Sequence, residues 1–198
     1  MASIYLSFKA RKASHDGRPQ ISSADRRLKD LPSGAWTPAL FHQATEEFLQ
    51  DTGFDVQILR KGDAVPRRMP ETRFRYDLDL ADEIADGALV AAVLEEGCYI
   101  GYGTAKQPPS PHEISVIDVD HYSRRSPDFQ HKLTIAGSEF SVGVGHIILA
   151  GLIAVLDRPI LADATHGASR YVCRSLGFVP DPTSEKPDRM RLVATSAA

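Results

Sequence analysis

The stretch from Ser141 to Leu156 constrains the fold of this chain more than any other segment. It contains two glycines one residue apart, Gly143 and Gly145, and continues from Ile147 as a run that is apolar on all sides. Such a run predicts a buried core helix, and it is shorter than the roughly 20 apolar residues that cross a bilayer. The glycines tolerate positive φ and leave space beside the first amides of the helix, where the helix dipole is positive. The stretch therefore predicts either an anion site suited to phosphate or pyrophosphate, or a tight turn before a core helix.

Length and composition indicate an ordinary globular domain. The chain has 198 residues, 42% hydrophobic and 25% charged, with a formal net charge of -3. This length favours one domain with its own core, and the charge provides no basic field, so a nucleic-acid partner is not expected. Cys98 and Cys173 lie far apart and no histidine pair has ligand spacing, so neither a disulfide scaffold nor a metal site is expected. The N-terminus lacks the apolar core of a secretory signal and no membrane span is predicted, so we expect a cytoplasmic protein.

Residues 1–53 differ in character from the rest of the chain. The segment 9–29 is polar and basic, which predicts a solvated extension, with a nucleic-acid or membrane patch as the alternative. Thr37-Pro38 is typical of a helix start with proline at the first helical position, and the apolar spacing after it predicts a helix over 39–51. We therefore expect an N-terminal extension and first helix over 1–53, which packs on a domain over 54–198.

The remaining sequence alternates between strand and helix patterns. In chain order, the predicted elements are a strand at 54–60, a hairpin at 88–104 that turns at Glu96-Gly97, a central strand at 112–120, a short hairpin at 132–135 and 139–142, the apolar helix, a strand at 158–164, a helix at 169–176 and last strands at 178–179 and 189–193. Gly177 is placed to end the last helix as its C-terminal cap. This order predicts an α/β fold of the α+β type with a mixed central sheet and flanking helices.

An acidic span lies between Asp77 and Asp86, where five residues are aspartate or glutamate. One interpretation is the exposed face of a helix or loop. The other is an acidic lip that attracts a cationic substrate by its electrostatic field.

Four segments, taken in order, carry a family resemblance. They are the hairpin at 93–102, the central strand and its exit at 117–125, the glycines at 143–145, and Arg174-Ser175-Leu176-Gly177-Phe178. In this order and spacing they resemble parts of the GNAT superfamily of acyl-CoA-dependent N-acyltransferases. The hairpin resembles the family's second and third strands, and the central strand resembles its fourth strand. The glycines resemble the end of its pyrophosphate loop, and the last segment resembles its closing helix and sixth strand. The resemblance extends roughly from residue 54 to residue 193.

The resemblance implies a fold, a cofactor and a reaction. In this family the fourth and fifth strands splay apart, and the gap holds the pantetheine arm of acetyl-CoA, the acyl donor. The implied reaction transfers acetyl from acetyl-CoA to a primary amine of a small molecule or protein by direct attack on the thioester. The cofactor-binding residues implied are Val119, Arg124, Arg125, Val142, Gly143, Val144, Gly145 and His146.

The reaction needs groups that move protons. The amine must lose a proton and the leaving thiolate must gain one. Asp120 or His121, near the end of the central strand, can serve as base or position a water, although His121 also fits an ordinary surface histidine. The family often has a tyrosine acid at the position of Cys173, so the acid here is expected to be Tyr171 or Cys173.

Two departures from the family pattern suggest an alternative function. Phe140 occupies the place where the family usually has Arg or Gln, and an insertion at 126–142 separates Arg125 from the glycines. Together with Cys173, these changes leave open a non-catalytic GNAT-like module that binds CoA or a partner protein. The sequence does not identify the acceptor, and it leaves a homodimer open.

Overall fold

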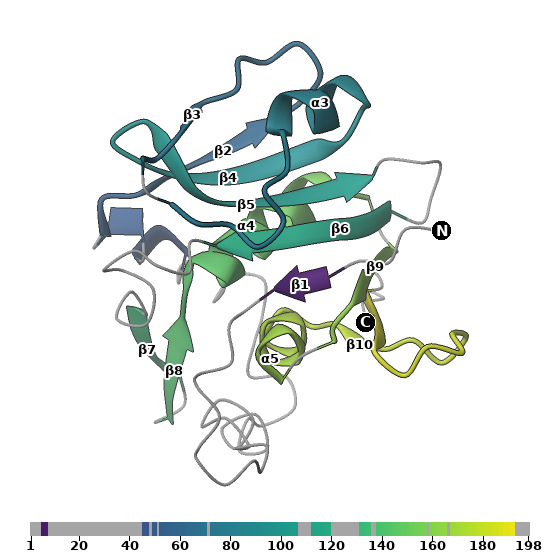
Figure 1. Ribbon diagram of the computed structural model, residues 1–198. Coiled ribbons are helices and arrows are strands. Elements are labelled where there is room, and N and C mark those ends of the chain that lie inside the picture. Colours follow the sequence, from purple (N-terminus) through teal and green to yellow (C-terminus); the bar gives the residue numbers. More distant parts are fainter. Residues whose placement is uncertain are drawn as a thin grey trace, which may run out of the picture.

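The computed structural model describes residues 5–7, 45–47, 49–50, 52–70, 72–106, 112–119, 131–135, 138–157, 159–165 and 167–192. Over these ranges the chain forms a nine-stranded sheet and a separate two-stranded sheet (Figure 1). No helix among the described residues is long and apolar enough to span a membrane.

The main sheet is mixed, as predicted. Its strands follow the order β10-β11-β9-β6-β5-β4-β2, with β1 paired to β6 and β3 paired to β5. The strands are β1 (Tyr5–Ser7), β2 (Asp55–Leu59), β3 (Arg67–Arg68), β4 (Leu89–Glu95), β5 (Cys98–Lys106), β6 (His112–Val119), β9 (Ile160–Asp163), β10 (Val179–Pro180) and β11 (Arg189–Leu192). Strands β2, β4, β5 and β6 are antiparallel neighbours, whereas β6 and β9 run parallel. This arrangement confirms the predicted fold class.

The β4–β5 hairpin turns where the sequence predicts. Glu96 and Gly97 have φ values of 51° and 77°, the left-handed pair that a type I′ hairpin turn requires. The register of the two strands shifts by one residue at Ile100, which has no partner on β4. This β-bulge brings Tyr99 and Tyr102, three positions apart, to the same face of the sheet.

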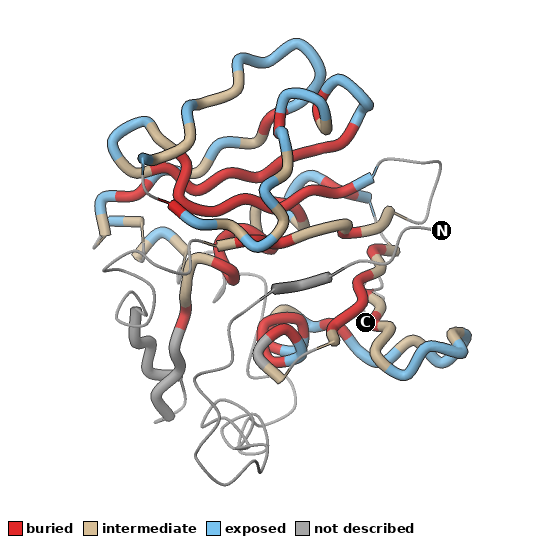
Figure 2. Tube along the Cα trace, viewed as in Figure 1, coloured by how far each residue is buried: buried red, intermediate tan, exposed pale blue. Residues whose placement is uncertain are grey.

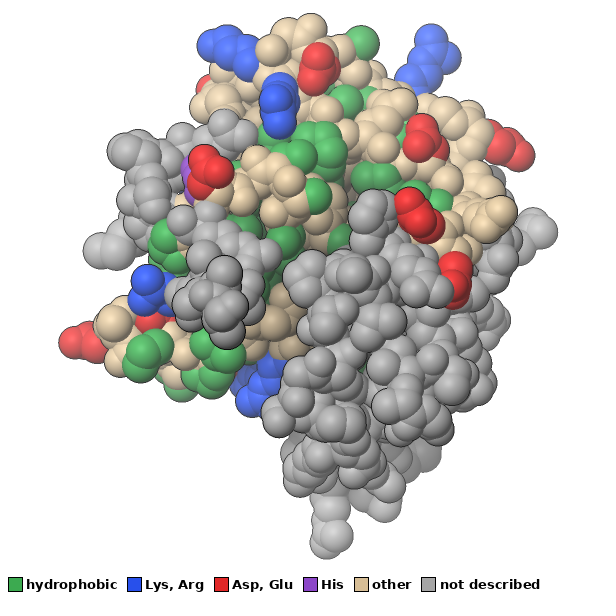
Figure 3. Space-filling model, turned by 180° about the vertical axis from the view of Figure 1, so that it is seen from behind, with side chains coloured by type: hydrophobic (Ala, Val, Ile, Leu, Met, Phe, Trp, Pro, Cys, Tyr) green, Lys and Arg blue, Asp and Glu red, His purple; other side chains and the backbone are tan. Residues whose placement is uncertain are grey.

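Helix α4 (Val144–Val155) packs on the opposite face, behind the sheet in Figure 1. Close approach is possible because β5 carries glycines there: a Cβ on Gly103 would lie 2.5 Å from Ile148 Cγ2. Figure 2 shows buried residues along β4 and β5, and Ile148, Leu149 and Leu152 of α4 are fully buried against them. The prediction of a buried core helix is confirmed. Seen from behind (Figure 3), hydrophobic side chains gather at the centre of this side, and charged ones lie around them.

The tyrosine face of β5 is covered by the segment 72–79 and by helix α3 (Leu80–Ala85). Phe74 contacts both tyrosines, with ring centroids 5.6 Å from Tyr99 and 5.0 Å from Tyr102. Asp79 caps α3, because its side chain accepts hydrogen bonds from the backbone N–H groups of Ala81 and Asp82. The part of the acidic span that lies in α3 therefore fits the first interpretation, the face of a helix.

The C-terminal elements also agree with the predictions. Helix α5 (Gly167–Ser175) is followed by Gly177 at φ 88°, the left-handed residue expected beyond a helix end. The short extra hairpin is present as β7 (His131–Ile135) and β8 (Ser138–Val142), which form the two-stranded sheet. Of the helix predicted over 39–51, residues 45–47 and 49–50 are helical, as is residue 52 beyond its predicted end, and its start lies outside the described residues. The division of the chain at residue 53 stays a prediction.

Candidate functional site

A divergence of two neighbouring strands marks the candidate site. The parallel strands β6 and β9 pair only at their beginnings, His112 with Ile160 and Glu113 with Leu161. Farther along, the edge of β6 from Val116 to Asp118 pairs instead with β1. The two strands therefore separate toward their C-terminal ends, which is the splay expected between the fourth and fifth strands of the family's sheet.

The first turn of α4 lies at the C-terminal end of β6. Val119, the last residue of β6, is in register with Gly101 of β5. A Cβ on Gly101 would lie 3.0 Å from Val144 Cγ1 and 3.4 Å from the Asp118 carbonyl oxygen, so helix and strands approach closely here. The predicted residues Val119 and Val144 thus both lie beside Gly101, which sequence reasoning did not identify.

The first two amides of α4 lack an acceptor in the part of the chain that the structure describes. Gly143 is extended, with φ -125°, and Gly145 is inside the helix, so neither glycine uses the positive φ that the sequence allows. The Gly143 N–H donates to Nδ1 of His146 at 3.2 Å. The N–H groups of Val144 and Gly145 have no acceptor among the described residues. These two amides lie at the positive end of the helix dipole, where an anion would bind; Val144 is partly exposed and Gly145 is buried.

His146 is buried, with 5% of its surface exposed. Burial lowers its pKa to about 4, so the imidazole is neutral at neutral pH. Its Nδ1 accepts from Gly143, and its Nε2 has no hydrogen-bond partner in the described part of the chain. Its ring contacts Tyr171 of α5 edge to face, with centroids 5.4 Å apart. A neutral imidazole adds no positive charge to a phosphate site, so His146 shapes the turn through its acceptor nitrogen.

The two acid candidates on α5 have different surroundings. Tyr171 lies against the first turn of α4 through its contact with His146 and is 6% exposed. Cys173 is fully buried in the main hydrophobic cluster, and this burial raises the pKa of its thiol. A protonated thiol in an apolar core behaves as a small packing residue. Asp120, His121, Arg124 and Arg125 lie outside the described residues, so their places stay predictions.

Sequence reasoning did not assign a site role to Asp118, on the other face of β6. Asp118 is fully buried, and its Oδ2 accepts a hydrogen bond from the Tyr76 N–H at 2.8 Å. It is in register with Tyr102, whose pKa is raised by burial and by the Asp118 charge. An aspartate within an apolar strand pattern is the signal that could have found this pair, because buried carboxylates need hydrogen-bond partners.

The acidic span lines an open pocket of ≈ 290 Å³ on the same tyrosine face. Asp77 and Asp79 contribute to its wall with Tyr99, and Arg68 forms an ion pair with Asp77. The remaining lining is apolar, from Val65, Pro66, Leu78 and Leu80. The second interpretation of the span, an acidic lip, is thus compatible with the position of Asp77 and Asp79. Within the described ranges, no three metal-ligating side chains come together.

Three solved structures are similar to this chain at low identity. One is a mutant AtaT toxin bound to the C-terminus of the antitoxin AtaR, 13% identical over 71% of this chain and 91% of that chain, with a TM-score of 0.41. The same complex with acetyl-CoA is 10% identical over 71% and 92%, with a TM-score of 0.37. The AtaT–AtaR complex bound to DNA is 14% identical over 70% and 93%, with a TM-score of 0.39. No protein-family model and no curated protein matches the sequence.

Proposed function

We propose that this chain is an acyl-CoA-dependent N-acyltransferase that transfers acetyl from acetyl-CoA to a primary amine. The observation that carries the proposal is the separation of β6 from β9 directly beside the first turn of α4. If β1 leaves the edge of β6 with which it pairs, the backbone groups of that edge can hold an extended, amide-containing arm by main-chain hydrogen bonds. The free amides of Val144 and Gly145 suit the pyrophosphate at the other end of that arm.

The proposed reaction is a direct displacement. The amine nitrogen attacks the thioester carbonyl, the C–N bond forms and the C–S bond breaks, and CoA leaves as a thiolate. A base takes the proton from the amine and an acid returns one to the sulfur. We assign the base to Asp120 or His121 and the acid to Tyr171, ahead of Cys173. A backbone N–H near Val119 is proposed to stabilise the oxyanion.

A cationic amine is the proposed acceptor. Asp77 and Asp79 lie at an open pocket that Arg68 also lines, and Arg68 pairs with Asp77, so among the described residues Asp79 supplies the carboxylate without a basic partner there. Helix α3 adds Asp82 and Glu83 in its first turn and has no basic residue in its last turn. Such a surface attracts a positively charged molecule and can hold its apolar part.

Strand β1 has to be reconciled with this mode of binding. It pairs with Val116, Ile117 and Asp118, the same edge of β6 that the acyl arm would use. The proposal therefore requires β1 to leave this edge when acetyl-CoA binds. A chain that lacks residues 1–8 is expected to bind CoA at least as tightly as the full chain, because nothing then competes for the edge.

Calorimetric titration with CoA tests the anion site. Gly145→Val places a branched side chain at the first turn of α4 and is expected to lower CoA affinity at least tenfold, by about 1.4 kcal/mol or more. Gly151→Ala is the matched control: its Cβ would lie 3.2 Å from Ile58 Cδ1, so it perturbs the packing of the same helix away from the first turn. If both variants fold and bind CoA as the wild type does, the glycines are only a turn.

Release of free CoA thiol from acetyl-CoA tests catalysis. The panel of acceptors comprises polyamines, aminoglycosides, amino acids and basic peptides, and turnover is expected with cationic amines. Loss of one acid–base group typically costs about 10²–10⁴-fold in rate, so substitutions at Asp120, His121 and Tyr171 are expected to exceed Cys173→Ala in effect. Tight acetyl-CoA binding without turnover would favour the alternative, a non-catalytic CoA- or protein-binding module.

The absence of a nucleic-acid partner also stays a prediction, which a gel shift with salt titration tests.

A further inference from the structure

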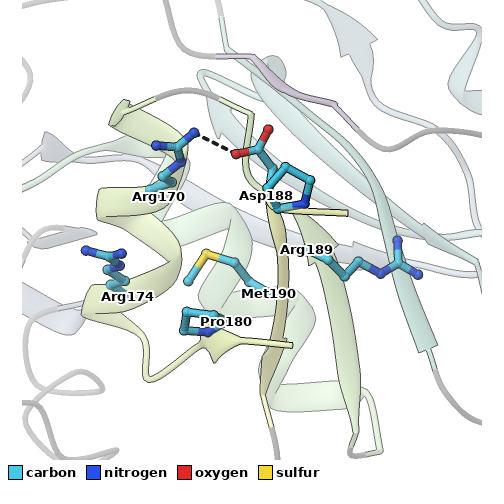
Figure 4. Close-up of a pocket in the computed structure, with 7 residues that line it drawn as sticks. Arg170, Arg174, Pro180, Asp188, Arg189 and Met190 are labelled. Atoms are coloured by element: carbon cyan, nitrogen blue, oxygen red, sulfur yellow. Dashed lines mark hydrogen bonds and ion pairs between the residues drawn. The ribbon is translucent and has the colours of Figure 1, made fainter. Parts of the chain in front are cut away.

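A second open pocket, of ≈ 210 Å³, lies between α5 and β11 (Figure 4). Its lining includes none of the residues assigned above to acyl transfer. Met190 forms its floor, with 4% of its surface exposed, and Pro180 and Pro187 add apolar walls. The volume corresponds to about seven waters at ≈ 30 Å³ each, which is the size of a small molecule or one amino-acid side chain with its stem.

Two arginines one helical turn apart provide the positive charge of this pocket. Arg170 is oriented by two hydrogen bonds, from Nη2 to Asp188 Oδ1 at 2.6 Å and from Nε to the Ala164 carbonyl at 3.2 Å. Arg174 is exposed and has no hydrogen-bond or ion-pair partner among the described residues. Both residues contribute to the lining, since residues i and i+4 are neighbours on a helix, and Arg170 reaches toward Asp188 in Figure 4.

The third arginine of the lining belongs to a different network. Arg189 points away from α5 in Figure 4 and donates to Glu113 at 2.6 Å and to Asp163 at 2.9 Å. Its guanidinium is therefore neutralised outside the pocket. The charge that remains for a ligand is that of Arg174, with the outer Nη of Arg170, set against the single carboxylate of Asp188.

We propose that this pocket binds a carboxylate carried on a short apolar stem. The guanidinium fork matches a carboxylate, and Met190 with the two prolines matches the stem, which inorganic phosphate lacks. The ion pair between Arg170 and Asp188 is a precedent within the same pocket for carboxylate binding. The carboxylate can come from a free small organic acid or from a glutamate side chain of a polypeptide, and the two sources are distinguished by the probe.

Because Asp188 places a negative charge in the same pocket, the proposal predicts opposite changes in carboxylate affinity for substitutions at Arg174 and at Asp188. Removing Arg174 takes away the free cation and weakens binding. Replacing Asp188 by asparagine removes the like charge and leaves only a neutral acceptor for Arg170 Nη2, so it strengthens binding. In this ion pair the Arg170 side chain is 46% exposed and the Asp188 side chain 32% exposed. Exposed pairs contribute little to stability, so the Asp188→Asn variant is expected to fold.

The experiment is a titration of the full-length protein, followed by amide chemical shifts at constant ionic strength. The probes are butyrate for the free acid and N-acetyl-glutamyl-amide for the peptide source. We expect saturable shifts in α5 and β11 with at least one probe, at millimolar dissociation constants. Arg174→Ala is expected to weaken that binding about tenfold, and Asp188→Asn to strengthen it severalfold.

Arg60→Ala is the matched control, because it removes the same charge at a distant place. Arg60 is exposed beside β2, at the opposite edge of the sheet. It should leave the affinity unchanged. Saturation by butyrate alone assigns the free acid, and saturation by the peptide probe assigns a polypeptide. Three results would each overturn the proposal: no saturable shift with either probe, equal loss in Arg60→Ala and Arg174→Ala, or tighter binding of inorganic phosphate than of both carboxylates.

Discussion

Strand β5 has two faces that are built from opposite kinds of residue. Toward α4 it presents Gly101 and Gly103, and the helix packs closely against these glycines through apolar side chains. Toward the segment 72–79 it presents Tyr99 and Tyr102, large rings whose hydroxyls need polar partners. The glycine face is therefore a close-packed scaffold without spare volume. The tyrosine face carries the polar groups and the acidic pocket.

A titratable group is buried on each side of the sheet, His146 in α4 where it contacts α5 and Tyr102 on β5, and burial shifts their pKa values in opposite directions. On the glycine side, burial lowers the pKa of His146 to about 4. On the tyrosine side, burial, helped by the Asp118 charge, raises the pKa of Tyr102. In both cases the low-dielectric interior disfavours the charged form. The comparison teaches that the contact between α4 and α5 limits stability in acid and the tyrosine face limits it in alkali.

The largest expected effect is the loss of stability in acid through His146. The unfolded state binds a proton near the ordinary pKa of 6.5, whereas the folded state binds it only near 4. The free energy of unfolding is therefore unaffected by this group above pH 6.5 and falls as the pH drops toward 4, by about 1.4 kcal/mol per pH unit and about 3 kcal/mol in total.

The variant His146→Gln tests this origin. Glutamine at this position can still accept from the Gly143 N–H, as in a capping box, but does not titrate. Denaturant unfolding at several pH values between 7 and 4 gives the slope of the free energy of unfolding against pH. This slope should be shallower in the variant by about 1 kcal/mol per pH unit. Equal slopes would mean that His146 is protonated in the fold and that its contact with Tyr171 is open to water.

The second effect measures how tightly the glycine face is packed. A Cβ on Gly103 would lie 2.5 Å from Ile148 Cγ2, so Gly103→Ala should reduce the free energy of unfolding by about 2 kcal/mol. Gly101→Ala is the matched variant on the same face. Its nearest contacts would be 3.0 Å to Val144 Cγ1 and 3.1 Å to Ile148 Cδ1, so its cost should be smaller. Thermal and urea unfolding compare the two, and the reverse order would contradict the close approach at Gly103.

The third effect is the alkaline limit set by Tyr102. In the unfolded state tyrosine ionises above its ordinary pKa of 10, but the raised pKa keeps Tyr102 neutral in the fold. Stability is fully present below pH 10 and should fall by about 1 kcal/mol over the next pH unit. Tyr102→Phe should remove this fall and cost about 1 kcal/mol at neutral pH, because the hydroxyl no longer accepts from the Leu78 N–H. Because the chain has 6 tyrosines, the difference in tyrosinate absorbance between the wild type and Tyr102→Phe monitors the ionisation of Tyr102, and a difference that appears near pH 10 would contradict the burial argument.

How far the sequence predicts this molecule depends on how local each signal is. The turn at Glu96-Gly97 and the helix end at Gly177 follow from backbone chemistry within a few residues, and both are confirmed. The two faces of β5 do not follow from alternation, because the bulge at Ile100 shifts the pattern by one position. A bulge depends on contacts between strands, which a single strand pattern does not contain.

The candidate site divides in the same way. The glycines and the apolar run identify the start of α4, because they are contiguous in the sequence. That His146 accepts from Gly143 and faces Tyr171 depends on how α4 and α5 pack, and no sequence spacing specifies it. The burial of Asp118 likewise depends on Tyr76, 42 positions earlier in the chain.

The smallest expected effect concerns how the segment over the tyrosine face is held. Arg68 binds it through Thr72, from Nε to Oγ1 at 2.9 Å and from Nη2 to the carbonyl oxygen at 2.6 Å, and it also pairs with Asp77. The Asp77 side chain is 74% exposed, and exposed ion pairs contribute about 0–1 kcal/mol. Asp77→Asn should therefore change the free energy of unfolding by less than about 0.5 kcal/mol, since asparagine also tolerates the φ of 36° found there. Arg68→Ala, which breaks the bonds to Thr72 as well, should cost more in the same urea titration. If Asp77→Asn were the more damaging of the two, the ion pair rather than Thr72 would anchor the segment, and the tyrosine face would depend on a contact that salt can screen.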